Sequence, residues 1–233
     1  MKKIIIFLMF LGVATASQAT IYYVKETPSG LGDGTSWANA SDDLQAMIII
    51  AGTGDTIWVA EGTYKPTHSS NNPLAVNLNI NDRHNTFTLK DGVVILGGFP
   101  NTINPDLSNR NWAMYRTILS GDIGTANDST DNAYHVVVAD DLGSQTVLDG
   151  FFITGGYADS TQTVSLSTQR RGGGMYIYNS FAQFINLIIH NNYAQTYGGG
   201  IAIRGSSFPT FLNVLIHNNT ARNSGGGVLN DAS

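Results

Sequence analysis

Apolar and polar residues alternate along most of the chain, most clearly near its C-terminal end. The segment 184–194 (FINLIIHNNYA) recurs as 211–221 (FLNVLIHNNTA), at an offset of 27 residues. A period of two places alternate side chains on one face of a strand, whereas a helix needs a period near 3.6. Both segments are therefore predicted to be strands, with Ile185, Leu187 and Ile189 on one face.

Three consecutive glycines follow each copy of this repeat. The triplets lie at 172–174, 198–200 and 225–227, and the first belongs to an earlier, divergent copy at 148–158. Residues 159–171 delay that first triplet and form a polar insertion, which we expect to be an exposed loop. Short alternating segments follow the glycines, so each repeat contains two strands and a turn that glycine permits.

A repeat of this kind cannot bury an apolar face alone, but stacked repeats bury a common interior. Neighbouring parallel strands would lie about 4.8 Å apart, and such crossovers are right-handed. The predicted fold is therefore all-β, a right-handed parallel β-helix. A β-propeller fits less well, because each blade needs four antiparallel strands in about 40 residues.

Less regular alternation continues the pattern upstream. Strands are expected at 55–60, 87–89, 93–96, 117–119 and 134–139, with a turn at 61–64 and long loops at 65–86, 99–116 and 121–132. Residues 41–51 are expected to form one short helix, with Ser41 as its N-cap and two aspartates in its first turn. This helix would cover the open apolar end of the coil.

The first 19 residues have the pattern of a secretory signal peptide. Lys2 and Lys3 precede an apolar segment at 4–13, and small residues favour cleavage after Ala19. The apolar segment is shorter than the ~20 residues that span a bilayer. We therefore expect export, no membrane-spanning segment after cleavage, and one β-helix domain over 20–233 that is truncated at its C-terminal end.

Composition narrows the possible functions. The chain has no cysteine, which excludes disulfides, cysteine-ligated zinc and thiol nucleophiles. Its net charge of −5, with scattered basic residues, argues against a nucleic-acid partner. Only 12% of residues are charged and 26 are glycines, while the hydrophobic share of 42% is that of a folded protein.

Polar residues also recur at fixed positions of the repeat. Three pairs are expected to stack in successive turns: Asn186 on Asn213, Asn191 on Asn218 and His190 on His217. Amides at strand spacing hydrogen-bond along such a stack. The histidine pair could also suggest a metal site, but no carboxylate recurs beside it.

These segments resemble the secreted right-handed parallel β-helix proteins of the pectate-lyase-like superfamily. The resemblance is carried by 34–40 (GTSWANA), 54–64 (GDTIWVAEGTY), 92–99 (GVVILGGF) and 117–122 (TILSGD). The glycine-triplet units are similar to repeats of chlamydial polymorphic outer-membrane proteins and of large surface proteins of Bacteroidetes-type bacteria. The superfamily includes lyases, hydrolases and adhesins, so the resemblance implies a fold and export rather than one activity.

Lyases of this superfamily use an arginine or lysine as the base, which directs attention to the arginines. The candidates are Arg110, Arg116, Arg170, Arg171 and Arg204, although a solvated or structural role is the favoured interpretation of each. Hydrolases need two carboxylates at a fixed separation. Asp140 and Asp141 are adjacent, but neighbours in a strand point to opposite faces unless the chain turns there.

A calcium site is a further alternative. Loop oxygens could come from Asp122, Asp128, Asp131 and Asn132. The fixed Asp-x-Asp-x-Asp-Gly spacing is missing, and Asp and Asn also cap turns.

Taken together, the repeats carry no recurrent acid, base or metal set. This favours a non-enzymatic, exported surface protein with a structural or adhesive role, whose partner is a polysaccharide or a host or cell-surface ligand. The alternative is a lyase or glycoside hydrolase for acidic polysaccharide, with a site built by the long upstream loops. No catalytic residue is assigned, and no cofactor is expected beyond the calcium alternative.

Overall fold

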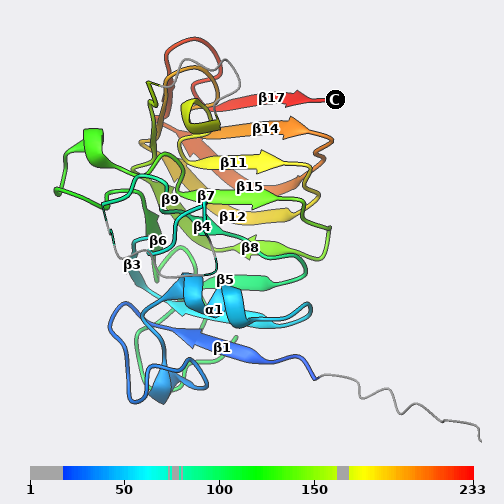
Figure 1. The fold of residues 1–233 in the computed structure, drawn as a ribbon. Coiled ribbons are helices and arrows are strands. Elements are labelled where there is room, and N and C mark those ends of the chain that lie inside the picture. The colour runs from blue at the N-terminus through cyan, green and yellow to red at the C-terminus, as the bar shows by residue number, and fades with distance from the viewer. Residues whose placement is uncertain (1–17, 73, 75–78, 80, 162–167) are drawn as a thin grey trace, which may run out of the picture.

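A computed structural model describes residues 18–72, 74, 79, 81–161 and 168–233. The predicted signal peptide therefore lies outside the described residues except for its last two positions, as does 162–167 of the polar insertion. The described chain winds into a coil of stacked strands that runs from β1 at one end to β17 at the other (Figure 1). All named strand pairs are parallel, so the fold is an all-β parallel β-helix, as predicted.

Three sheets form the walls of the coil. The long sheet contains β1 (Ile21–Val24), β2 (Thr56–Ala60), β3 (Gly62–Tyr64), β5 (Val94–Phe99), β6 (Thr117–Ser120), β8 (Val147–Asp149), β9 (Phe151–Thr154), β12 (Gln183–His190) and β15 (Thr210–His217). The five-stranded sheet contains β4 (Phe87–Thr88), β7 (Val137–Asp140), β11 (Met175–Tyr178), β14 (Ile201–Gly205) and β17 (Val228–Ala232). The short sheet contains β10 (Tyr157–Ala158), β13 (Tyr193–Ala194) and β16 (Thr220–Ala221).

The register confirms the repeat read from the sequence. Strand β12 pairs with β15 from Gln183 opposite Thr210 to His190 opposite His217. The rings of His190 and His217 are stacked, with centroids 5.3 Å apart. Among the described residues, no three His, Cys, Asp or Glu side chains group as a metal site.

The predicted inner face of this repeat is partly wrong. Phe184, Leu187 and Ile189 are fully buried in the core, whereas Ile185 is only partly buried. Asn186 has a φ of +52°, and this left-handed residue shifts the alternation within β12. The shift falls between the part of β12 that pairs with β8 and the part that pairs with β9.

The asparagine stacks are confirmed for one pair and corrected for the other. Asn213 Nδ2 donates to Asn186 Oδ1 at 2.7 Å. Asn191 instead adopts a left-handed backbone and is linked to Asn218 through main-chain atoms. The next residue, Asn192, points its side chain inward and donates to Asn219 Oδ1 at 3.0 Å.

A short N-terminal helix covers one end of the coil, as predicted. Helix α1 (Leu44–Ile50) packs against β1, β2 and β4 (Figure 1). Its Gln45 side chain accepts from the N–H of Thr88 and donates to its carbonyl oxygen, which satisfies the exposed edge of β4. The N-cap is Asp43 rather than Ser41, because the Asp43 carboxylate accepts from Ala46 N–H.

The remaining elements are short. The described part of the chain contains the 3₁₀ helices η1 (Trp37–Asn39), η2 (Ser129–Asp131) and η3 (Thr168–Arg170). The predicted turn at 61–64 is wrong, because β3 occupies it and pairs with β6. No described helix is long and apolar enough to cross a membrane.

Candidate functional site

The outward face of the five-stranded sheet carries two rows of side chains. One row places Thr88, Val138 and Tyr176 side by side in β4, β7 and β11. The other consists of Asp140, Tyr178, Arg204 and Asp231 in β7, β11, β14 and β17. Paired residues of adjacent parallel strands lie about 4.8 Å apart, so both rows run along the axis of the coil.

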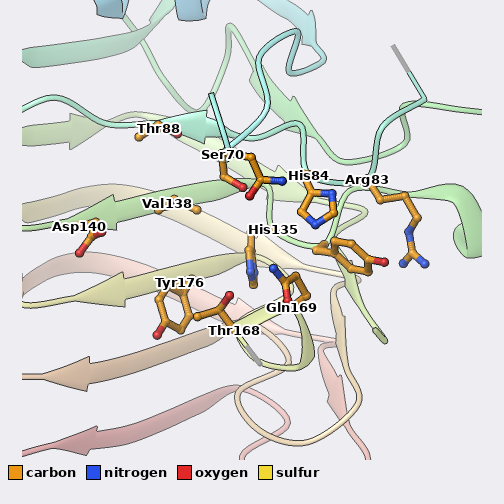
Figure 2. A pocket seen from close by; sticks show the side chains of 12 residues that line it. Ser70, Arg83, His84, Thr88, His135, Val138, Asp140, Thr168, Gln169 and Tyr176 are labelled. Carbon is orange, nitrogen blue, oxygen red and sulfur yellow. The ribbon is translucent and has the colours of Figure 1, made fainter. Parts of the chain in front are cut away.

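Two adjoining cavities lie over this face. The first, of about 350 Å³, is bounded by the sheet and by residues of three loops, among them Ser70, His84 and Gln169 (Figure 2). The second, of about 410 Å³, is lined by Arg171, Tyr178 and Arg204. Both cavities share the residues Asp140, Thr168 and Tyr176. We call the two cavities together the groove.

His135 forms part of the floor of the first cavity (Figure 2). Its Nδ1 lies 2.9 Å from the carbonyl oxygen of Gly172, so Nδ1 carries the proton and donates. Nε2 is buried and has no hydrogen-bond partner among the described residues. Burial, together with nearby His84, lowers the pKa of His135 to about 4. The ring is therefore neutral near pH 7.

The burial of His135 predicts a pH dependence of stability. The folded pKa of about 4 lies below the ordinary value of 6.5, so the unfolded chain binds a proton at higher pH than the folded chain. The free energy of unfolding should therefore fall by about 2–3 kcal/mol as pH drops from 6.5 to 4. Urea titrations of wild type and His135→Gln across this range measure the effect. The variant should lose less stability over this range; an equal loss would contradict the prediction.

Tyr176 and Asp140 supply hydrogen-bonding groups where the two cavities meet. Burial, and secondarily the charge of Asp140, raises the pKa of Tyr176 to about 12, so its hydroxyl stays protonated. Burial and neighbouring Asp141 raise the pKa of Asp140 above its ordinary value. Tyr176 can thus donate a hydrogen bond, and the carboxyl group of Asp140 can accept one.

The arginines at the groove differ in how free they are to bind a ligand. Arg83 is held by the carbonyl oxygens of Asn132 and Tyr157 and by the carboxylate of Asp159, at 2.5–2.7 Å. Its guanidinium also lies 4.3 Å from the Tyr134 ring centre. Arg204 makes a longer contact, 3.3 Å, with Asp231, whose side chain is 59% exposed. Arg83 therefore supports the wall, while Arg204 is positioned to meet a ligand.

The five candidate arginines of the sequence analysis differ in whether they line the groove. Arg171 and Arg204 line the groove. Arg110 instead donates to the carbonyl oxygens of Gly97 and Asp149, and Arg116 lies over the Phe152 ring. Arg170 ends η3 and does not line the groove.

The carboxylates are likewise separated. Asp140 lines both cavities, but Asp141 has a φ of +52° where the chain turns after β7, and it lines neither. The two therefore do not form a pair across the groove. Asp122, Asp128, Asp131 and Asn132 lie in the 121–132 loop and do not line either cavity, although the carbonyl oxygen of Asn132 accepts from Arg83 of the groove.

Sequence reasoning did not identify His84, His135, Tyr176 or Tyr178. A signal for the two tyrosines was present, because they alternate with Met175 and Ile177 in the short segment that follows the glycine triplet. His84 meets the groove only because its loop folds over the sheet, whereas His135 lies just before β7; no local pattern marks either residue.

Comparison with known proteins adds little to this description. No protein-family model and no curated protein matches the chain. A solved structure titled "Crystal structure of pectate lyase Pel9A" is similar, with 17% sequence identity and a TM-score of 0.44. The match covers 83% of this chain but only 40% of that one.

Proposed function

We propose that this chain is an exported β-helix protein that binds a polysaccharide along the groove without cleaving it. The observation that carries the proposal is the row of Asp140, Tyr178 and Arg204, which continues from strand to strand beside two adjoining cavities. A row along the coil axis suits a linear ligand with many similar units.

The chemistry of the row also suits a sugar. A tyrosine presents an apolar ring and a polar hydroxyl, so it can contact both the C–H and the O–H groups of a sugar. Tyr178 is 39% exposed. Tyr176, two residues earlier in β11, lines the first cavity. Asp140 accepts hydrogen bonds, whereas Arg171 and Arg204 favour ligands that also carry carboxylates or sulfates.

The protonation states favour binding over acid–base catalysis. Efficient general acids and bases have pKa values near the working pH. The pKa of His135, about 4, is far below neutrality, and that of Tyr176, about 12, is far above it. Asp140 is the one carboxylate among the groove-lining residues described, whereas glycoside hydrolysis by the usual mechanism needs two.

The second candidate function is a lyase for acidic polysaccharide. One observation favours it: Arg171 and Arg204 both line the cavity that Asp140 enters. An arginine there could neutralise a uronate and stand near the proton to be removed. Cleavage products separate this function from binding alone.

Export is supported by the position of Thr20, the residue after the predicted cleavage site. The backbone N–H of Thr20 lies 2.7 Å from Asp55 Oδ1, and β1 begins at the next residue. Cleavage after Ala19 would convert this N–H to an ammonium group that pairs with the carboxylate. A chain recovered outside the cell should begin at Thr20; retention inside the cell with residues 1–19 attached would contradict export.

Binding is tested with the chain from Thr20 to Ser233 and a panel of pectate, alginate, chondroitin and neutral glucans, by affinity electrophoresis. We expect retardation by at least one polymer and no new reducing or unsaturated ends. Tyr178→Ala should weaken binding about tenfold, equivalent to about 1.4 kcal/mol.

Phe181→Ala is the matched control, because Phe181 has similar exposure, 45%, and does not line the groove. Equal losses in both variants, or no retardation by any polymer, would contradict the proposed site. New chain ends that vanish in Arg204→Ala would establish the lyase instead.

A further inference from the structure

The loop at 121–132 contains three side-chain oxygens without partners. Its ends are joined by a hydrogen bond from Ala133 N–H to the carbonyl oxygen of Gly121, at 2.8 Å. The Oδ1 atoms of Asp122, Asp131 and Asn132 are shielded from water and have no hydrogen-bond partner among the described residues. Asn132 as a whole is only 6% exposed.

In each of these side chains the other terminal atom is held in place. Asp122 Oδ2 accepts weakly from Asn127 N–H at 3.4 Å, and Asp131 Oδ2 accepts from Thr125 N–H at 2.7 Å. Asn132 Nδ2 donates to the carbonyl oxygen of Gly155 at 2.7 Å. The head groups are thus oriented by the backbone, and one oxygen of each is left free.

Neighbouring contacts place these residues at the base of one loop. The hydrogen bond between residues 121 and 133 brings Asp122 beside Asn132. Both approach Gly155: a Cβ built there would lie 3.3 Å from the Asp122 nitrogen and 3.7 Å from Asn132 Nδ2. Asp131 follows directly before Asn132, and its carboxylate packs against Gly124, inside the same loop.

Charge makes this arrangement costly without a ligand. Neither Asp122 nor Asp131 forms an ion pair with the basic side chains described, and Arg83, which binds the carbonyl oxygen of Asn132, is already paired with Asp159. Buried carboxylate oxygens without partners lose hydration and gain nothing in return. A cation would both supply a partner for such oxygens and offset the charge of the two carboxylates.

We propose that Asp122, Asp131 and Asn132 bind a calcium ion at the base of this loop. Calcium accepts carboxylate and amide oxygens in irregular arrangements, whereas magnesium demands near-octahedral geometry and retains its waters. Because only two carboxylates contribute, main-chain carbonyls and water would complete the shell. The ion would stabilise the loop that leads into Tyr134 and His135, two residues of the groove.

Calorimetric titration of the chelator-treated wild type with calcium chloride tests the proposal, alongside thermal unfolding with and without calcium. One ion should bind, and the midpoint of thermal unfolding should rise by several degrees. Asp131→Asn and Asp122→Asn should each weaken calcium binding at least tenfold. Circular dichroism checks that the variants fold, and the wild-type titration stands even where a variant does not.

Asp128→Asn is the matched control in the same loop. Asp128 is exposed, and its carboxylate accepts from the backbone and hydroxyl of Thr130. This variant should bind calcium as the wild type does. Absence of calcium binding by the wild type, an equal loss in Asp128→Asn, or magnesium binding as tight as calcium binding would overturn the proposal.

Discussion

Gly156→Ala should lower the free energy of unfolding by at least about 3 kcal/mol, or prevent folding. Gly156 lies just before β10 and close to the glycine triplet that precedes β11. A Cβ at this position would lie 1.8 Å from the carbonyl oxygen of Gly173 and 2.5 Å from its carbonyl carbon. Both atoms belong to the backbone of the glycine triplet in the same repeat, so no side-chain rotation relieves the clash. Urea unfolding followed by circular dichroism measures the loss.

The matched control is Gly52→Ala. A Cβ at Gly52 would make only one ordinary contact, 3.6 Å from the Asp55 side chain. Its effect should therefore stay within about 0.5 kcal/mol. Equal stability of the two variants would mean that the backbones at Gly156 and Gly173 do not lie as close together as described.

Asn192→Ala should lower the free energy of unfolding by about 2–4 kcal/mol. Asn192 is 2% exposed, and its Oδ1 accepts from Gly156 N–H at 2.9 Å. Its Nδ2 donates to the carbonyl oxygens of Ile153 and His190. Alanine would remove all three hydrogen bonds and leave the buried N–H of Gly156 without this partner. Thermal and urea unfolding give the change.

Asn213→Gly provides the comparison for this prediction. Asn213 makes one exposed amide hydrogen bond to Asn186, and glycine keeps its left-handed backbone without strain. The expected loss is below about 1 kcal/mol. An equal loss of free energy of unfolding in both variants would mean that the inward amide of Asn192 does not stabilise the turn between β12 and β13.

The sequence was sufficient to predict the coil because the repeat itself encodes the stacking. Matching segments at 184–194 and 211–221 had to align once the strands were parallel, and the histidine stack follows from that register. The errors arise where backbone conformation overrides side-chain alternation. Left-handed Asn186 turns Ile185 out of the core, and left-handed Asn191 leaves Asn192 to form the inward amide stack.

The groove was harder to predict than the coil. Its floor is built from one sheet, but His84 and Gln169 come from two segments that lie far apart in the sequence. Their meeting depends on how those segments cover the sheet, which no periodic pattern describes. Arg204 and Asp140 were recognised as candidates from the sequence. That both line the same cavity was not predicted.

The claim that the groove binds polysaccharide is tested most directly by amide chemical-shift mapping of the mature chain. The ligand is an oligosaccharide of the polymer that retards the chain in affinity electrophoresis. We predict shifts concentrated in β7, β11 and β14, with small changes at the separate surface cavity lined by Thr102, Arg110 and Tyr115. Shifts confined to that other cavity, or no shifts at saturating oligosaccharide, would contradict the account.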